Sequence, residues 1–521
     1  MPKLRAERSD PRDLRLLSRL APSVEPADLC GNFVVGSPPP VTPDGWRLQT
    51  LGGWTIAVEP RLPVADAIDE SGAQIGWLLG HALDLEAARP VEKAVLPREP
   101  ADGASFRPAV QRWIDRHAGR YLLVLVGPGL VAPDSLATLS AVFDRERGVI
   151  SSSPFLLQPP NEPIPDDELA DLFRVDESSL YFLFTATPHA RAERMLPNHI
   201  LDLTTWRQIR EWPTGPYERG TQEELVERIA VTIERTIAAA AVNDELNQSM
   251  TAGGDTRVML ACSRPVLDRV HLFTVAQPDS VGRTDAIVSS QLASRFGYDH
   301  RVLPLQPWTR DDLRRFMIRT GALAGEKRGS EAGPTYALLG ADRPYVSGVH
   351  ERTSLGWRPD DSRSMRLDGA DLLRRYDTPP HPRLVAAADR WLAELPGLDA
   401  VDALTLLGTE LRFGLWGGAL TTAYPDAYTY TLYPFAHRSI LDAELQMEFA
   451  MRRYGAYRED LIRSRWPELL ELGINVEPRA VRVARRVKEA RVGARNAVAA
   501  TPVGNVVRWA KRTLGHAGRA G

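Results

Sequence analysis

The chain has 521 residues, of which 43% are hydrophobic and 25% are charged, and its formal net charge at pH 7 is -3. This length is enough for two domains with sizeable cores. No stretch approaches about eighteen uncharged apolar residues, and Met1-Pro2-Lys3-Leu4-Arg5 is not a signal-peptide start, so we expect a cytoplasmic protein. Cys30 and Cys262 form neither a disulfide framework nor a zinc pattern, and we expect Cys262 to be a buried small hydrophobe.

The amino-terminal part of the chain is predicted to be rich in β-strands. Residues 1–28 are charged and interrupted by prolines, which indicates an extension. Residues 29–217 contain short runs of β-branched and aromatic residues separated by turn clusters such as Pro43-Asp44-Gly45. The runs that we expect to form strands are residues 32–35, 54–58, 74–79, 121–126, 181–184 and 199–203. A domain boundary is predicted at residues 213–220.

A second domain of α/β type is predicted for residues 218–475. Four apolar residues recur at helical spacing after the boundary: Leu225, Ile229, Ile233 and Ile237. The acidic residues Glu223 and Glu224 mark the start of this helix, because negative charge is favourable at a helix amino terminus. Further on, residues 272–275 predict a short buried strand, and residues 284–296 predict a helix that ends at Gly297.

A glycine-rich turn of sequence Thr-Ala-Gly-Gly-Asp-Thr occupies residues 251–256, directly before an apolar run that predicts a helix. Adjacent glycines let the backbone approach a ligand and adopt left-handed angles, and a helix start offers free N–H donors to an anion. Thr251 and Thr256 add hydroxyl donors, and Asp255 can hold Mg²⁺ or a nucleotide hydroxyl. The same string is also typical of a tight turn with a helix cap, so both interpretations stay open.

The turn resembles the Ser-Gly-Gly-x-Asp-Ser pyrophosphate-binding loop of the ATP-pyrophosphatase domain in the asparagine synthetase family, with Thr for each Ser and Ala for the first Gly. The strand at residues 272–275, Asp285 and the Gly-Tyr-x-His sequence at residues 297–300 follow in the family's order. Tyr345-Val346-Ser347-Gly348 is similar to the strand and turn that carry the family's third loop. The resemblance implies a parallel α/β domain, like the adenine nucleotide alpha hydrolases, that binds ATP and Mg²⁺.

The resemblance also implies roles for individual residues. Nucleotide contacts are implied for Thr251, Gly253, Gly254, Asp255, Thr256, Val275, Ser347 and Gly348. Asp255 and Asp285 are the implied ligands of the metal or the ribose region. Glu351 and Arg458 are the implied catalytic residues, since Glu351 is the acid that remains in the third loop and Arg458 stands where the family has a pyrophosphate-binding lysine. An arginine keeps the charge of lysine but not its compact geometry.

The β-rich region is similar to the family's glutaminase domain, a sandwich of the amino-terminal-nucleophile hydrolase type, at Gly119-Arg120-Tyr121-Leu122 and Leu196-Pro197-Asn198-His199. Such a glutaminase needs cysteine as its first residue, because the free α-amine serves as general base. Here Met1 is followed by Pro2, and residues 79–82 hold no carboxylate for a glutamine clamp. We therefore expect an inactive domain. The alternative is processing before Cys30, since Leu29-Cys30-Gly31 resembles the family's opening strand.

The reaction implied by the resemblance is amide formation through an acyl-adenylate. We expect an ATP-dependent ligase that acts on a small-molecule or peptide carboxylate and uses ammonia or a substrate amine, not glutamine. The family's third loop is rich in acids, whereas Arg352 stands here where an acid is expected. The alternative is therefore a catalytically inactive binding or scaffold protein of a peptide-modifying or polysaccharide gene cluster.

The chain ends in a basic tail, residues 476–521. From Arg479 to Gly521 there are eleven basic residues and one acid, Glu489. Val481, Ala484 and Val487 fall at helical spacing, which predicts a basic amphipathic segment at the periphery of an anionic membrane. No specific nucleic acid is expected. The alternative is a solvated terminus, because the apolar face has no aromatic anchor.

Overall fold

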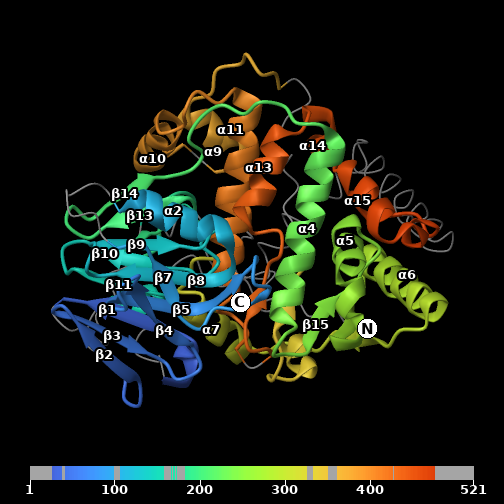
Figure 1. Ribbon diagram of the computed structural model, residues 1–521, viewed down its shortest axis with the longest axis horizontal. Helices are drawn as coiled ribbons and strands as arrows, with labels where there is room; N and C mark the ends of the chain where they lie inside the picture. Colours follow the sequence, from blue (N-terminus) through green and yellow to red (C-terminus); the bar gives the residue numbers. More distant parts are fainter. Residues whose placement is uncertain are drawn as a thin grey trace, which may run out of the picture.

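The chain forms a mixed α/β structure that includes a parallel sheet. The computed structural model describes residues 26–37, 42–98, 106–157, 166, 168–169, 172, 182–324, 333–349, 361–378, 380–425 and 427–475. Glu351, Arg352 and the basic tail lie outside these residues. Figure 1 shows the β-rich part on the left, the parallel-sheet part on the right, and the long helix α4 (Gln222–Ala240) between them.

Two largely antiparallel sheets make up the β-rich part. In spatial order the first contains β12 (Glu193–Arg194), β10 (Val142–Asp144), β11 (Val149–Ser151), β1 (Phe33–Gly36), β3 (Trp54–Val58) and β2 (Arg47–Leu51). The second contains β14 (Arg207–Arg210), β13 (His199–Asp202), β9 (Leu130–Pro133), β8 (His117–Leu125), β5 (Gln74–Asp84), β4 (Val64–Asp69) and β7 (Ala94–Leu96), with β6 (Arg89–Pro90) paired to β5.

The two sheets pack face to face. Phe33 of the first sheet and Trp77 and Leu122 of the second are fully buried in one cluster. Because strand side chains alternate between the two faces, residues of the opposite parity form a second layer. Trp113 of helix α2 (Arg107–Arg116) belongs to that layer and covers the outer face of the second sheet.

Most of the strands predicted for this region overlap observed ones, namely β1, β3, β5, β8 and β13. The strand predicted at residues 181–184 is wrong for its described part, residues 182–184, which form no strand. Phe184 lies in a turn with a φ of 55°, and Phe182 and Phe184 are buried in the main core. The apolar composition of this segment therefore reflects burial in a loop.

Five parallel strands form the third sheet. In spatial order they are β17 (His300–Pro304), β16 (Val270–Ala276), β15 (Leu246–Ser249), β18 (Tyr345–Val346) and β19 (Thr431–Leu432). The chain starts at the central strand β15, moves outward through β16 and β17, and then returns to the other side of β15. The order therefore reverses between β15 and β18. In open parallel sheets, ligands bind outside the carboxyl ends of the strands at such a reversal.

Helices cover this sheet and connect it to the β-rich part. The α-helices after α4 are α5 (Gly254–Ser263), α6 (Ser280–Phe296), α7 (Arg310–Arg319), α9 (Gly369–Arg375), α10 (Pro382–Ala393), α11 (Ala400–Leu407), α12 (Gly418–Leu420), α13 (Arg438–Gln446), α14 (Phe449–Tyr454) and α15 (Tyr457–Arg465). A π-helix, η7 (Gly408–Gly417), joins α11 to α12. The 3-10 helices are η3 (Pro26–Leu29), η4 (Pro154–Leu156), η5 (Arg264–Arg269), η6 (Ala337–Leu339) and η8 (Pro467–Leu470). In the described part of the chain, no helix has the length and apolar character needed to cross a membrane.

The predicted start of α4 and the predicted end of α6 agree with the structure, whereas α6 begins at Ser280, four residues before its predicted start. The Thr221 side chain caps α4 by accepting the N–H of Glu224, and α6 ends at Gly297, whose φ is 69°. A left-handed glycine at this position is a common helix end, because a side chain would be strained there.

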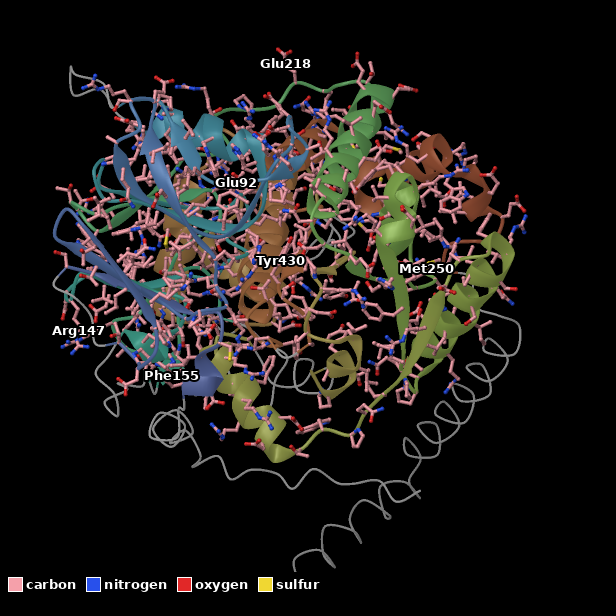
Figure 2. The ribbon with its side chains drawn as sticks, turned by 60° about the horizontal axis from the view of Figure 1, so that its bottom comes forward. Glu92, Arg147, Phe155, Glu218, Met250 and Tyr430 are labelled. Atoms are coloured by element: carbon pink, nitrogen blue, oxygen red, sulfur yellow. The ribbon has the colours of Figure 1, made fainter. Side chains whose placement is uncertain are left out.

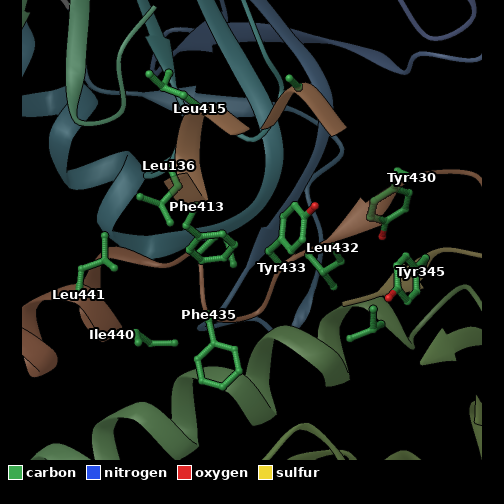
Figure 3. Packing of buried hydrophobic residues seen from close by; sticks show 14 of the residues in the cluster. Leu136, Tyr345, Phe413, Leu415, Tyr430, Leu432, Tyr433, Phe435, Ile440 and Leu441 are labelled. Carbon is green, nitrogen blue, oxygen red and sulfur yellow. The ribbon is translucent and has the colours of Figure 1, made fainter. Parts of the chain in front are cut away.

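The main core extends from the parallel sheet into the β-rich part. A Cβ atom at Gly414 of η7 would lie 2.5 Å from Cγ of Pro197, so the π-helix packs directly on the β-rich part. Figure 3 shows Phe413 close to Tyr433, and their rings meet edge to face with centroids 5.3 Å apart. Leu136 of the β-rich part belongs to the same cluster. The two parts thus share one continuous core.

Candidate functional site

The glycine-rich turn lies at the carboxyl end of β15. Met250, labelled in Figure 2, extends this strand, because its N–H donates to the Phe273 carbonyl at 2.7 Å. The Thr274 hydroxyl donates to the Met250 carbonyl at 2.6 Å and lies 2.8 Å from Nε2 of His300. Helix α5 begins directly after the turn, at Gly254. Residues 251–256 are therefore held at the edge of the sheet where the strand order reverses.

Hydrogen bonds inside the turn use part of its donor set. The hydroxyl oxygens of Thr251 and Thr256 are 2.8 Å apart, the Thr251 N–H donates to the Thr256 hydroxyl at 3.1 Å, and the Gly253 N–H donates to the Thr251 hydroxyl at 3.0 Å. The N–H groups of Gly254, Asp255 and Thr256 begin α5 and have no acceptor among the described residues. These three groups are the donors that the turn offers to an anion.

Neither glycine of the turn uses the left-handed angles that are open to glycine. Gly253 has a φ of -73° and a ψ of 158°, and Gly254 is the first residue of the helix. The close packing of the turn is the better reason for a glycine at position 253, because a Cβ at Gly253 would lie 3.1 Å from the Thr251 hydroxyl oxygen. A Cβ at Gly348 would lie 3.1 Å from Cγ2 of Thr256, so the third loop starts against the first turn of α5.

The other strands of the sheet end near the turn. Val275 is half-buried near the carboxyl end of β16, two residues beyond Phe273, which pairs with Ser249 of β15. Ser347 follows β18, is buried, and donates its N–H to the Leu432 carbonyl at 2.9 Å. The topology therefore brings the predicted residues from three separate strands to one edge of the sheet.

Asp285 contacts the backbone of the turn. Its Oδ1 atom accepts the N–H of Ala252 at 2.8 Å, and the Ala252 carbonyl accepts the N–H of Asn475 at 2.9 Å. Burial raises the pKa of the Asp285 carboxyl, and the hydrogen bond from Ala252 opposes this rise. Asp285 thus reaches the predicted site, where its observed contact positions the turn.

Asp255 and Arg458 are brought together from α5 and α15. Nε of Arg458 lies 2.7 Å from Oδ1 of Asp255, and their side chains are 12% and 31% exposed, respectively. Burial alone would lower the pKa of Arg458, but Tyr457 and Asp255 raise it overall. Gly455, with a φ of 61°, leaves room for the Arg458 guanidinium, which a Cβ at Gly455 would contact too closely. A ligand that uses either partner has to compete with this ion pair.

Arg257 is a site residue that the sequence motif did not indicate. It lies in the first turn of α5, is fully buried, and donates to the carbonyls of Leu469 and Gly473 at 3.0 Å each and to that of Leu472. Burial lowers its pKa to about 10, and no described carboxylate is paired with it. This buried positive charge adds to the helix dipole and favours an anion beside the turn.

Carboxylates for a metal ion are sparse in the described part of the site. No group of three or more His, Cys, Asp or Glu side chains in the described residues could hold a metal. Mg²⁺ in nucleotide sites usually needs only one or two protein carboxylates, because phosphates and waters complete its shell. Asp255 fits such a role, and Glu351 lies outside the described residues.

Cys30 and two histidines of the β-rich part, His81 and His117, have structural contacts. Cys30 is 4% exposed, and Arg61 donates to its Sγ atom. The His81 ring stacks on Tyr430 with centroids 3.7 Å apart, and burial lowers the pKa of His81 to about 3. Nδ1 of His117 lies 2.6 Å from the Trp113 carbonyl. Both histidines therefore have packing or hydrogen-bond partners within the protein.

No protein-family model matches the chain, and no curated protein matches it either. The family of the chain therefore stays open, and the resemblance rests on the motifs quoted above. The strand-order reversal, the N–H groups at the start of α5 and the charges of Arg257, Arg458 and Asp255 are the features on which a function can be proposed.

Proposed function

We propose that residues 251–256 bind the phosphates of ATP and that the chain is an asparagine synthetase-like, ATP-dependent amide-forming ligase. One observation carries this proposal. The N–H groups of Gly254, Asp255 and Thr256, which have no acceptor among the described residues, lie on the same helix turn as the buried cation Arg257, at the point where the strand order reverses. In this proposal the parallel sheet is an ATP-pyrophosphatase domain, and the packed antiparallel sheets are an inactive glutaminase-like sandwich.

The proposed reaction has two steps. A carboxylate oxygen of the substrate attacks the α-phosphorus of ATP and pyrophosphate leaves; an amine nitrogen then attacks the acyl carbon, AMP leaves, and the amine loses a proton. The N–H groups of Gly254, Asp255 and Thr256 bind the departing pyrophosphate, and Arg458 neutralises its charge after separating from Asp255. Asp255 would hold Mg²⁺, which supplies further positive charge to the phosphates.

The acyl donor in this proposal is a small-molecule or peptide carboxylate. The nitrogen comes from ammonia or a substrate amine, because Cys30 is internal to the sequence, buried and engaged by Arg61. We place the protein in the cytoplasm and propose that its basic tail attaches it to anionic membrane surfaces.

A second candidate is an inactive scaffold that keeps the fold. The ion pair between Asp255 and Arg458 favours it, because each of the two charges already has a partner within the protein. In that case the turn would be a tight helix cap stabilised by its two threonine hydroxyls.

Nucleotide binding and pyrophosphate release separate the two candidates. The ligase should bind ATP in a Mg²⁺-dependent manner by calorimetry and should release pyrophosphate when a panel of carboxylic acids includes its substrate. Asp268→Asn, which changes an exposed carboxylate in η5, is a matched control for variants of the turn. Absence of ATP binding by the wild-type protein with and without Mg²⁺ would leave the scaffold.

A further inference from the structure

A cavity lies between the β-rich part and helix α10, away from the glycine-rich turn. Its volume is about 580 Å³, and residues of β10, β12, β13, β14 and α10 form its wall. Figure 1 shows β14 and α10 on one side of the molecule and α5, the helix that follows the turn, on the other. Small-molecule sites in proteins have volumes of about 300–1,000 Å³. The cavity is therefore large enough for a small molecule and is separate from the proposed phosphate site.

Aromatic side chains with fixed positions form apolar walls of the cavity. Trp391 of α10 is 2% exposed, and its indole N–H donates to Oε2 of Glu410 at 2.7 Å. The Arg210 guanidinium lies 5.4 Å from the centre of the Trp391 ring. In the β-rich part, the ring centroids of Trp206 and Phe143 are 6.3 Å apart. Because contacts within the protein already hold these rings, they can pack against a planar ligand at little cost in side-chain ordering.

The carboxylates of the cavity have partners within the protein. Glu193 of β12 forms an ion pair with Arg145. Oε2 of Glu394, which follows α10, lies 3.1 Å from Nε2 of His199, whose ring is buried in the wall. These contacts engage both acidic side chains that line the cavity.

Two arginines of the cavity have no such partner. Arg207 of β14 and Arg390 of α10 are exposed, and their guanidinium groups make no hydrogen bond or ion pair with any residue that the structure describes. A guanidinium binds carboxylate and phosphate groups through planar, bidentate hydrogen bonds. Exposed arginines are common on protein surfaces, but these two come from distant segments of the chain and line one cavity with aromatic walls.

We propose that this cavity binds a small aromatic anion, meaning a planar ring that carries a carboxylate or a phosphate. The ring packs against Trp206 and Trp391, and the anionic group binds Arg207 and Arg390. The aromatic walls favour a ring over an aliphatic chain, and the two unpaired cations favour a negative charge. This inference does not depend on the proposed nucleotide site.

Calorimetric binding of 1-naphthyl phosphate and of 2-naphthoate to the full-length protein tests the inference. The control probes are 2-naphthalenemethanol, which has the ring without the charge, and inorganic phosphate, which has the charge without the ring. We expect saturable binding of an aromatic anion and weaker binding of both controls. Excess Mg-pyrophosphate should not displace the aromatic anion, because its proposed site is the glycine-rich turn.

Three variants locate the bound probe. Arg207→Ala with Arg390→Ala should weaken binding about three- to thirtyfold, the range for two exposed ion contacts. Arg235→Ala with Arg366→Ala is the matched control, because it removes the same charge from two exposed arginines that do not line the cavity; it should change binding less than about twofold. Ala387→Phe adds a ring to the α10 wall and should abolish binding. Melting temperatures check that each variant is folded.

Several results would overturn the inference and leave the nucleotide site untouched. They are the absence of saturable binding of both aromatic anions to the wild-type protein, equal affinity for the uncharged probe, and equal weakening in the two double variants. Unchanged binding by a folded Ala387→Phe variant would also overturn it. Displacement by Mg-pyrophosphate would place the probe at the turn and overturn the inference in favour of that site. Replacement of Arg207 and Arg390 by lysine should retain most of the affinity, since lysine keeps the charge.

Discussion

Asp255 and Arg458 form an ion pair of 2.7 Å that joins the first turn of α5 to the first turn of α15. The two residues are more than two hundred positions apart in the chain, and both belong to the site that the family resemblance implies. Their contact links α15 to the turn. Ligand affinity therefore includes the free energy needed to separate them.

We expect Asp255→Asn to weaken Mg-ATP binding while leaving the fold intact, because the side chain is partly exposed at a helix start. Loss of one charge-assisted contact costs about 1.5–3 kcal/mol, which corresponds to roughly ten- to a hundredfold in affinity. Calorimetry with Mg-ATP measures the change, and circular dichroism checks the fold. Equal affinity of the variant and the wild-type protein would show that Asp255 is not a ligand-binding residue.

Asp285 is expected to respond differently to two substitutions. Burial raises the pKa of Asp285, so its charged form costs stability at pH 7 and protonation relieves that cost at low pH. Asp285→Asn keeps an acceptor for the Ala252 N–H and should maintain or raise the melting temperature at pH 7. Asp285→Ala leaves that N–H without its partner and should cost about 1–3 kcal/mol. Loss of Mg-ATP binding in a stable Asp285→Asn variant would instead indicate a metal ligand.

Glutamine should not be the nitrogen source. Cys30 is buried beside Arg61, and without processing before it Cys30 has no free α-amine to act as general base. The protein should release no glutamate from glutamine, with or without ATP. Cys30→Ala is the control, and turnover above that control would revive processing before Cys30.

His437 makes stability depend on pH. It caps α13 by accepting the Ser439 N–H at Nδ1, and burial, with Arg438 and His117 nearby, lowers its pKa from 6.5 to about 3. Between these values the unfolded chain binds a proton that the folded chain does not, so stability falls as the pH drops.

His437→Asn keeps a capping acceptor. We expect its unfolding free energy to fall less steeply, by about 1.4 kcal/mol per pH unit below about 6.5. Equal slopes in urea titrations at pH 7 and 5 would contradict this.

The basic tail should attach the protein to anionic vesicles. Each basic residue near the surface contributes about 1 kcal/mol, and salt screens this attraction beyond about 8 Å at physiological ionic strength. Sedimentation with phosphatidylserine vesicles at low salt should carry down the full-length protein but not a protein truncated after Pro478. Equal partitioning would identify a solvated terminus, and competition by DNA would indicate general polyanion binding.

Sequence patterns predicted the strands β16 and β18 and the helices α4 and α6 of the parallel-sheet part, but not its central strand β15 or its edge strands β17 and β19. The helices α4 and α6 have apolar residues at helical spacing, and the strand β16 is a short apolar run, so the sequence alone indicates where they lie. Strand β15 has the sequence Leu-Asn-Gln-Ser and shows no strand signal, although Asn247 and Gln248 are buried. Gln248 is accommodated by the Ser263 hydroxyl, which donates to its Oε1 at 2.6 Å. Because two of its four residues are buried polar side chains, this strand lacks the apolar pattern that would have predicted it.

The candidate site was predictable only where a local motif defines it. The turn at residues 251–256 and Asp285 follow a recognisable order. Arg257 had no such signal, because its contacts join segments that are about two hundred residues apart. The sequence shows only that Arg257 is a charged residue directly before the apolar run Val258-Met259-Leu260-Ala261.

The packing of η7 ties the pitch of a helix to the presence of the β-rich part. A π-helix is rare and wide, and this one packs through Gly414 against Pro197. Its Glu410 carboxylate accepts hydrogen bonds from Nη1 and Nη2 of Arg210 at 2.7 and 3.0 Å. Rewinding η7 into an α-helix would rotate every later side chain about its axis and misalign the approach to β19. The β-rich part would therefore have a structural role even without chemistry of its own, because its contacts fix the π-helical winding of η7.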